Sequence, residues 1–302
     1  MKRGEQSGLG ASSGSSVWPV TVIVLLLLAL WYIATVGLNL AWEKDVAKRA
    51  GRTDVDILEL VRGTMRQERP VLPAPHQVLD EIIETTIKKK VTSKRSLIYH
   101  AGITLSSSML GFLMGTLLGI VLAVGIVYNQ ALNRSLMPWI IASQTIPILA
   151  IAPMIIVVLN AVGVQGLLPK AFISMYLSFF PIVVGMVKGL NSPDISYMDL
   201  MHTYSASGAQ SFWKLRLPSS LPYLFTSMKI AVAISLVGAI VAELPTGAVA
   251  GLGARLLAGS YYGQTIQIWS ALVVASVVAA LLVMLIGLAG DYINRRMGLT
   301  HE

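Results

Sequence analysis

Few side chains in this sequence have the type and spacing that catalysis requires. Cysteine is absent, which excludes disulfides and thiolate metal sites. The phosphate-loop pattern G-x-x-x-x-G-K-[ST] is also absent, as is any serine–histidine or paired-carboxylate arrangement within an apolar segment. No histidine pair has metal-ligand spacing, so we expect solvated side chains at all four histidines: His76, His100, His202 and His301. The sequence therefore predicts no catalytic residue, no metal site and no cofactor bound by this chain.

Glu243 is the one acidic residue near the interior edge of an apolar segment. Ionisable groups inside membranes are costly and often functional, so a proton or ion site is one interpretation. Pro245 and Gly247 follow closely and favour a position near the outer interface, where water reaches the carboxylate. We expect a hydrogen-bonding role at an outer gate. For Tyr261 and Tyr262, an aromatic belt is a better interpretation than a substrate cage.

The composition is that of an integral membrane protein. Of the 302 residues, 55% are hydrophobic and only 13% are charged, whereas soluble domains carry roughly 25% charged residues. A membrane-spanning helix needs about 20 apolar residues. The sequence therefore predicts an all-α integral membrane protein with six transmembrane helices, at about residues 17–42, 98–128, 137–162, 167–190, 223–244 and 265–290.

The remaining segments are polar. Residues 1–16 are rich in glycine and serine and are expected to form a flexible tail, and residues 291–302 form a second tail. Residues 43–97 are charged and contain two amphipathic pieces separated by prolines, which predicts a periplasmic or interfacial excursion. A cleaved signal peptide is the alternative interpretation of residues 17–42. The length of that segment and its tryptophans favour a retained helix.

Glycines and prolines mark two of the expected spans. Gly111, Gly115 and Gly119 recur every four residues, so they share one helix face and allow another helix to approach closely. The third span is interrupted by three prolines: Pro138, Pro147 and Pro153. Gln144 and Thr145 are polar groups just before Pro147. Such a break often borders a transport pathway, so these three residues and Glu243 are the pathway or gate candidates.

The orientation follows from the basic residues outside the 43–97 excursion. Six spans place both termini on one side. That side would hold nine basic residues: Lys2, Arg3, Arg134, Lys188, Lys214, Arg216, Lys229, Arg295 and Arg296. The opposite side would hold only Lys170 and Arg255. Cytoplasmic loops carry the excess of Lys and Arg, so we expect both termini to be cytoplasmic.

The loop between the fourth and fifth spans, residues 194–222, is too long for a simple turn. Ser192, Pro193 and Asp194 predict a helix start, with the serine as the cap. Tyr197, Leu200, Met201 and Tyr204 then form an apolar stripe that we expect to hold this helix against the bundle. Small residues at 205–208 break the helix. A second helix, at 210–216, is expected to end at Leu217-Pro218. The two short helices predict a knob that inserts into a partner.

The same residues carry a resemblance to the coupling motif of bacterial ABC importer permeases, EAA-x3-G-x9-I-x-LP. Asp199 begins the EAA position, Ser205 takes the glycine position and Leu215 the isoleucine position, ahead of Leu217-Pro218. Three further stretches are similar to the nitrate/sulfonate/taurine-type permeases. They are the segment from Leu72 to Leu79, the passage from Ser205 to Pro222, and Glu243 followed by Gly251-Leu252-Gly253.

The resemblance implies a permease subunit with the type I fold of ABC importers, in the bacterial inner membrane, working by alternating access. It implies a second permease, identical or homologous, two ABC ATPase subunits that hold the ATP and magnesium, and a periplasmic binding protein. The implied substrate is a small nutrient, nitrate-, sulfonate- or taurine-like or of pyrimidine type. The implied ATPase-coupling residues are Asp199, Tyr204, Ser205, Ala206, Ser207, Phe212, Trp213, Leu217 and Pro218.

Two alternatives remain open beside the ABC permease. An ion-coupled secondary transporter would need no partner chain, but such proteins usually show paired halves and several buried charges. A non-transporting membrane scaffold is the other alternative. The lipid bilayer is an expected partner in each case, and nucleic acid is not.

Overall fold

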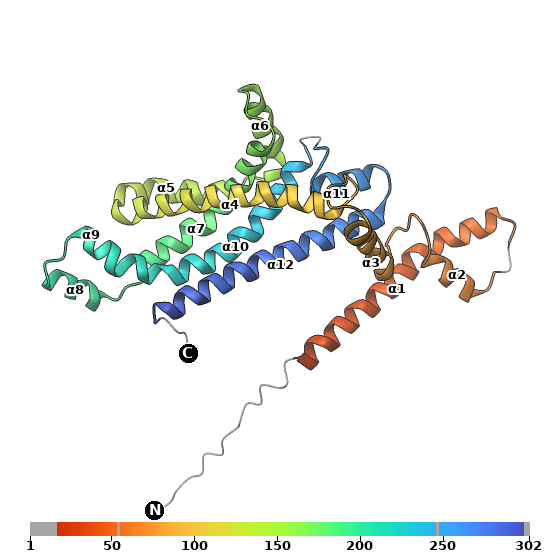
Figure 1. Cartoon of the computed structure of the whole chain (residues 1–302), viewed down its shortest axis with the longest axis horizontal. Helices are drawn as coiled ribbons and strands as arrows, with labels where there is room; N and C mark the ends of the chain where they lie inside the picture. The colour runs from red at the N-terminus through yellow and green to blue at the C-terminus, as the bar shows by residue number, and fades with distance from the viewer. Residues whose placement is uncertain (1–16, 53–54, 246–247, 299–302) are drawn as a thin grey trace, which may run out of the picture. The chain divides into compact units, whose positions relative to one another are not determined.

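The computed structural model of the chain describes residues 17–52, 55–245 and 248–298, and every regular element in them is helical. The chain divides into two compact units, Met1–Glu81 and Ile82–Glu302, which are treated separately below. The expected tail at 1–16 and residues 299–302 of the tail expected at 291–302, with His301 and Gly247, lie outside the described residues. Residues 291–296 were expected to belong to that tail but are helical. Figure 1 shows both units.

The first unit is a long apolar helix joined to short helices by a proline-rich segment. Helix α1 (Val17–Arg49) extends seven residues beyond the predicted span and is followed by α2 (Ile57–Thr64) and α3 (Pro75–Ile83). The fully buried Asn39 donates to the Leu72 carbonyl at 2.8 Å and accepts from the Val71 N–H at 2.7 Å. Because prolines have no N–H to donate, side chains of α1 hold this segment in place. His76 stacks on Tyr32, so the expectation that it is simply solvated is wrong.

The second unit contains the remaining helices. The long ones are α4 (Leu97–Tyr128), α7 (Leu167–Leu190), α10 (Leu217–Glu243) and α12 (Thr265–Arg296). Between them lie α5 (Gln130–Ser143), α6 (Ile148–Ala161), α8 (Ile195–Thr203), α9 (Gly208–Ser211) and α11 (Leu252–Tyr261). Two five-residue segments are π-helical: η1 (Glu84–Lys88) and η2 (Phe212–Arg216).

Helices α4 and α7 pack in parallel along the predicted glycine face. Gly111 faces Ser174, Gly115 faces Ser178 and Gly119 faces Ile182, so the residue numbers rise together along both helices. A Cβ on Gly111 would lie 2.6 Å from the Ala171 carbonyl oxygen, and one on Gly119 would lie 2.7 Å from the Ile182 Cβ. No side chain fits at these distances, so the three glycines confirm the close packing that their spacing predicts.

Helix α10 runs antiparallel to α7 and uses glycines from both helices. Gly189 of α7 meets Ser220, Gly185 meets Ser227, and Gly238 of α10 meets Ser174. Gly290 of α12 packs against Phe225 of α10 and Gly287 against Lys229, so α12 reverses direction again. The apolar core lies where α4, α7 and α10 meet, around Phe112, Ile182, Met186, Leu224 and Val232. α8 and α11 consequently lie at opposite ends of this bundle (Figure 1).

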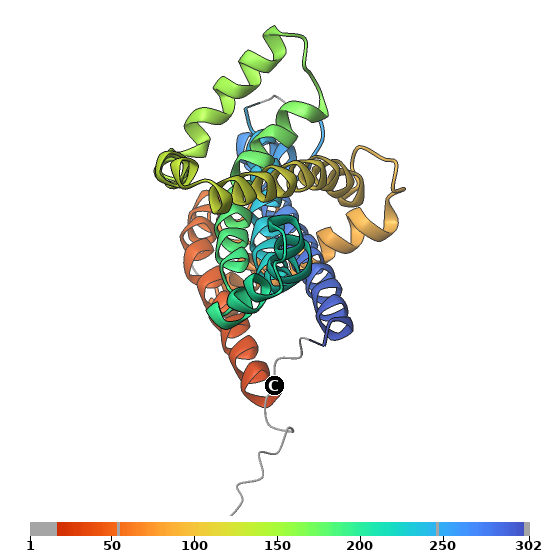
Figure 2. The same ribbon diagram turned by 90° about the vertical axis from the view of Figure 1, so that its left-hand side faces the viewer.

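The proline-interrupted third span is two helices, α5 and α6, bent by 102° (Figures 1 and 2). Pro138 and Pro153 lie inside α5 and α6, and the break falls at Pro147, the N-cap of α6. Because α4 and α7 are parallel, the chain must return from one end of the bundle to the other between them. The bent pair therefore makes one broken crossing and is not a re-entrant loop.

Among the described residues, five continuous helices are long and apolar enough to span a membrane, and counting the bent pair as one crossing brings the number to six. The predicted all-α fold with six transmembrane helices is confirmed. The fifth span begins earlier than expected, at Leu217 and not Tyr223. Lys229 was counted with the basic residues of the side that holds the termini, but it lies within α10, with its side chain beside Gly287 of α12.

We predict that Gly111→Ala destabilises the protein by about 1–3 kcal/mol, because the added methyl group would overlap the backbone of α7. Gly102→Ala on the same helix is the matched control. Nothing lies within 4 Å of a Cβ at Gly102, so that change should be neutral or stabilising by up to about 1 kcal/mol. Thermal unfolding of both variants in one detergent tests this, and equal midpoints would contradict the close contact between α4 and α7.

Candidate functional site

The segment between α7 and α10 forms one end of the bundle, seen end-on in Figure 2. Asp194 is the N-cap of α8, and its carboxylate accepts from the Ser196 N–H at 2.9 Å and the Ser196 hydroxyl at 3.0 Å. The backbone bond, followed by the hydroxyl bond, lowers the pKa of Asp194. Ser192 was the predicted cap, but its hydroxyl donates to the Gly189 carbonyl at the end of α7. The helix starts two residues later because a carboxylate caps it directly.

The apolar stripe of α8 does not pack onto the bundle. No residue of α8 is buried, and the exposed fractions of Tyr197, Leu200 and Tyr204 are 59%, 50% and 78%. The prediction that this stripe holds α8 to the rest of the chain is therefore wrong. Asp199 is exposed on the same helix. Apolar side chains gathered at an exposed helix indicate a surface that another molecule covers.

Ser205 adopts the left-handed conformation, with φ of 50°, and it is the one non-glycine residue among those described with a positive φ. Its N–H donates to the His202 carbonyl, and the N–H of Ala206 donates to the Met201 carbonyl, both at 2.9 Å. These two bonds define a Schellman motif that ends α8 after its C-cap Tyr204. A glycine normally occupies this position. The backbone thus has the shape that a motif glycine would favour at Ser205.

Ser207 starts the next helix through a capping box with Gln210. The Gln210 N–H donates to the Ser207 hydroxyl at 3.3 Å, and the Ser207 N–H donates to the Gln210 side-chain oxygen at 2.8 Å. Gln210 was not among the predicted site residues. The spacing S-x-x-Q before a helix was the signal that could have identified it. The turn between α8 and α9 is therefore defined on both sides by local hydrogen bonds.

Of the two aromatic residues after α9, Phe212 packs against the bundle and Trp213 is exposed to solvent. Phe212 packs edge-on against Tyr128 at the end of α4, with ring centroids 6.0 Å apart, and against Trp213 at 5.2 Å. Trp213 itself is 66% exposed. Arg216 lies 5.5 Å from the centre of the Tyr128 ring. Tyr128 and Arg216 therefore hold the segment around Phe212 against the end of α4. Neither was a predicted site residue.

Leu217-Pro218 does not end the second short helix, contrary to the prediction. The helix runs without interruption from Gly208 to Glu243, over 36 residues. The N–H of Leu217 donates to the Phe212 carbonyl five residues back, which is the π-helical pattern of η2. A π-helical turn of this kind allows a helix to accommodate a proline. Leu217 and Pro218 are therefore the start of α10, and the coupling candidates Phe212 and Trp213 are part of the same rod.

The pathway candidates fall into two places. Gln144 is the C-cap of α5, Thr145 donates to the Ala142 carbonyl at 2.8 Å, and Pro147 caps α6. All three are exposed at the bend. Tyr176 of α7 donates to the Ser143 carbonyl and supports the end of α5.

Glu243 is instead fully buried, 0% exposed, at the α11 end of the bundle. Its carboxylate accepts from the Thr104 hydroxyl at 2.9 Å and from the Gly253 N–H at 2.7 Å. The expectation that water reaches it is wrong, because the turn before α11 folds back and covers it. His100 is also buried, and its Nδ1 accepts from the Gly251 N–H at 2.9 Å. The prediction of a solvated His100 is therefore wrong as well.

The sequence matches the family described as the binding-protein-dependent transport system inner membrane component over residues 115–299. Among similar curated proteins is the formylaminopyrimidine transport permease ThiX of Halalkalibacterium halodurans, 33% identical over 61% of this chain and 68% of that protein. The nitrate import permease NrtB of Leptolyngbya laminosa is 24% identical over 95% of this chain and 92% of that protein. The putative aliphatic sulfonates permease SsuC of Bacillus subtilis is 24% identical over 75% and 78%.

Two solved structures of the MetNI methionine ABC transporter, in inward-facing conformations, share the fold. One has a TM-score of 0.51 at 24% identity over 66% of this chain and 92% of that chain. The other has a TM-score of 0.52 at 22% identity over 75% and 97%.

The helical bundle and the family match together define a multi-pass transport subunit of the membrane. The chain belongs to the family of binding-protein-dependent transport system inner membrane components, and it is the permease component of an ABC importer. The resemblance found in the sequence is therefore confirmed. The comparisons give no support to an ion-coupled secondary transporter.

We predict that glycine substitutions at Ser205 and Ser211 have opposite effects. Ser205→Gly removes the cost of about 1–2 kcal/mol that a side chain incurs in the left-handed region, so amide exchange between residues 200 and 212 should slow. Ser211 has helical φ and ψ of −62° and −37°. Ser211→Gly should therefore lower the free energy of local opening by about 0.5 kcal/mol and speed exchange. Hydrogen–deuterium exchange measures both, and faster exchange in Ser205→Gly would contradict the Schellman turn.

We predict that Glu243→Ala destabilises the protein by about 1–3 kcal/mol, because the buried Gly253 N–H loses its acceptor. Glu243→Gln retains a carbonyl acceptor and should cost less. Glu84→Ala, which removes an exposed ion pair with Lys89, is the control and should cost no more than about 1 kcal/mol. Thermal unfolding ranks the three variants, and an Ala variant as stable as the Glu84 control would rule out the buried acceptor.

Proposed function

We propose that this permease subunit couples transport to ATP hydrolysis on separate ATPase subunits, through the end of the bundle formed by α8, α9 and η2. The residues that make the contact are the predicted coupling set, with Asp199, Tyr204 and Trp213 exposed to the partner and Phe212, Leu217 and Pro218 joining the contact to α10. Ser205, Ala206 and Ser207 shape the turn. ATP and magnesium are bound by the partner, and this chain binds no cofactor.

The observation that carries this proposal is the turn at Ser205. Ser205, which aligns with the motif glycine, has a positive φ. Exposed apolar side chains lie on either side of it in the sequence: Tyr197, Leu200, Tyr204 and Trp213. An exposed Trp and two exposed Tyr are the residue types that dominate protein interfaces. The rigid turn fixes the angle between α8 and α9, so the pair presents a defined shape to a groove.

We further propose that the chain pairs with a second permease and receives its substrate from a periplasmic binding protein. The names of the relatives indicate three substrate classes: nitrate, aliphatic sulfonates and a formylaminopyrimidine. The substrate here is a small nutrient of nitrate, sulfonate, taurine or pyrimidine type. In this arrangement α8 and both termini face the cytoplasm, and α11 faces the periplasm. Gln144, Thr145 and Pro147 line the pathway at the bend, and Glu243 stabilises the outer gate.

We predict that Trp213→Ala and Asp199→Asn reduce ATP-driven uptake into proteoliposomes at least about tenfold, the size of a loss expected from one interface hot spot. Both side chains are exposed and contribute little to this chain's own packing, so membrane insertion and folding should be unchanged. The first measurement is retention of the ATPase by the tagged permease, followed by uptake and ATPase rates.

The matched controls are Trp42→Ala and Asp291→Asn, which change exposed residues of the same types on α1 and α12. Both should bind ATPase and transport as the unmodified protein does. Uptake that persists without ATP would contradict the proposal. So would normal ATPase binding and normal uptake in both Trp213→Ala and Asp199→Asn.

A further inference from the structure

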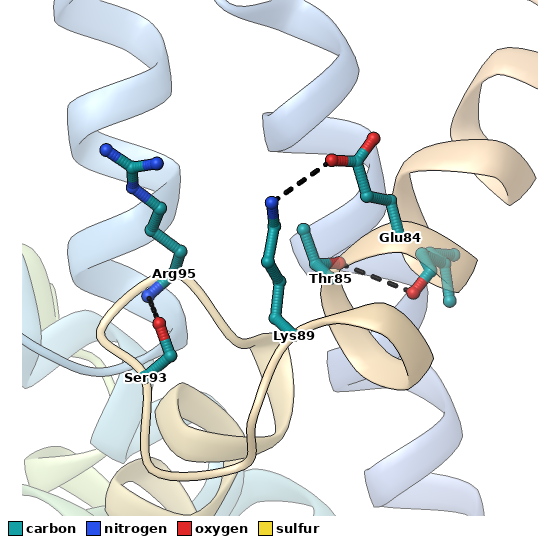
Figure 3. A network of polar contacts seen from close by, with 6 residues as sticks. Glu84, Thr85, Lys89, Ser93 and Arg95 are labelled. Carbon is teal, nitrogen blue, oxygen red and sulfur yellow. Dashed lines mark hydrogen bonds and ion pairs between the residues drawn. The ribbon is translucent and has the colours of Figure 1, made fainter.

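The end of the second unit that carries α11 has a strong excess of positive charge. Its basic residues are Lys88, Lys89, Lys90, Lys94, Arg95, Lys170 and Arg255, and the described acids of this unit at that end are Glu84 and Glu243. Glu84 is exposed and pairs with Lys89 at 3.3 Å, while Arg95 extends away from that pair (Figure 3). Glu243 is buried and hydrogen-bonded. The solvent-facing charge of this end is therefore positive.

This distribution is unusual for the orientation proposed above, because basic residues favour the cytoplasmic side of membrane proteins. The exposed loop from 88 to 95 concentrates five cations immediately before α4. A surface with one sign of charge raises the local concentration of ions of the other sign and speeds their arrival. The α11 end is thus suited to attract anions.

A cleft at the same end contains the groups that would bind an anion. It has a volume of about 630 Å³ and lies between α4, α6, the start of α7 and residues 248–250. Small-molecule sites are typically about 300–1,000 Å³. Its polar side chains are Asn160, Gln165 and Lys170, and no acid is among its described lining residues. Lys170 is half-buried.

The three polar side chains are available to a ligand. Within the described part of the chain, Lys170 makes no ion pair, and no side-chain hydrogen bond joins Asn160 or Gln165 to another residue. An ammonium group and two amide N–H₂ groups are all donors. Ile103 and Ile156 supply apolar walls beside the half-buried Lys170, and apolar surroundings strengthen an electrostatic contact.

We propose that this cleft binds a small organic or inorganic oxyanion, such as a sulfonate or nitrate, with the Lys170 ammonium as its charge partner and Asn160 and Gln165 as further donors. The proposal rests on the proposed function, since it narrows the transported nutrient to an anionic one. The loop at 88–95 attracts the anion by its field and makes no direct contact. The cleft is the entry position on the periplasmic side.

A structural role for Lys170 is the competing explanation. Lys170 interacts through space with the Glu243 carboxylate, although the two form no ion pair in the described residues. If that interaction were its sole role, removing the Lys170 charge would destabilise the fold without affecting any ligand. The two roles predict different measurements.

The test is calorimetric titration of the purified permease–ATPase complex in nanodiscs of zwitterionic lipid. Methanesulfonate is the probe, and methanesulfonamide is its neutral counterpart of nearly equal shape. Methanesulfonate should bind and methanesulfonamide should not. Lys170→Gln should weaken methanesulfonate binding at least about tenfold, as expected for loss of a charge-assisted hydrogen bond, and Lys170→Arg should retain it within about threefold.

The control variant is Lys90→Gln in the exposed loop, which should change affinity by no more than about twofold, and only at low salt. Equal binding of the sulfonamide, no binding of methanesulfonate, or unchanged affinity in Lys170→Gln would overturn the proposal. So would a lower unfolding temperature in Lys170→Gln with binding intact, which identifies the structural role.

A last measurement distinguishes a soluble anion from a lipid headgroup. Repeating the titration in nanodiscs that contain phosphatidylglycerol should leave methanesulfonate affinity nearly unchanged. Two observations together would show that the cleft binds a lipid headgroup. Methanesulfonate binding would be lost in these nanodiscs, and lipid phosphate would copurify with the unmodified chain but not with Lys170→Gln. That result would overturn the proposal of a soluble anion. The complex is purified through its ATPase, so a permease that does not retain the ATPase is detected before any titration. If the complex forms but binds no anion, only the anion proposal fails and the coupling function stands.

Discussion

The structure depends on the parallel contact between α4 and α7. Three glycines of α4 bring the backbones so close that Ser174, Ser178 and Ile182 lie where a side chain would otherwise be. In lipid there is little hydrophobic force between helices, so packing at short range has to supply the attraction. A parallel pair also requires an odd number of crossings between its members. The broken crossing of α5 and α6 follows from that requirement.

Much of this architecture could be predicted from the sequence, because its signals are local. The length of each apolar run predicted where a helix crosses, and the four-residue spacing of Gly111, Gly115 and Gly119 predicted the face that packs. The spacing of the coupling motif placed Ser205 at a glycine position, and the backbone there has the positive φ that such a position implies. These inferences required no knowledge of distant neighbours.

The incorrect predictions concern residues whose surroundings are set by remote parts of the chain or by another molecule. Glu243 and His100 were expected to be solvated, but the turn at Gly251–Gly253 returns from beyond α10 and covers both. The stripe at Tyr197 and Leu200 has the periodicity of a buried face, yet in this chain it is exposed. Periodicity identifies an apolar face but does not say whether its partner belongs to the same chain. The prediction that Leu217-Pro218 ends a helix is wrong because the π-helical turn before it has no simple sequence signal.

The unbroken helix from Gly208 to Glu243 has a mechanical consequence. Its 36 residues form a rod about 54 Å long, with Trp213 near one end and the buried Glu243 at the other. It packs on α7 at both sides of its middle, through Ser220, Ser227 and Gly238. Tilting the rod as a whole would therefore require these close glycine contacts to separate. The π-helical turn at 212–216 is the least regular part of the rod and comes before the first of these contacts, so bending there leaves the packed part of α10 in place.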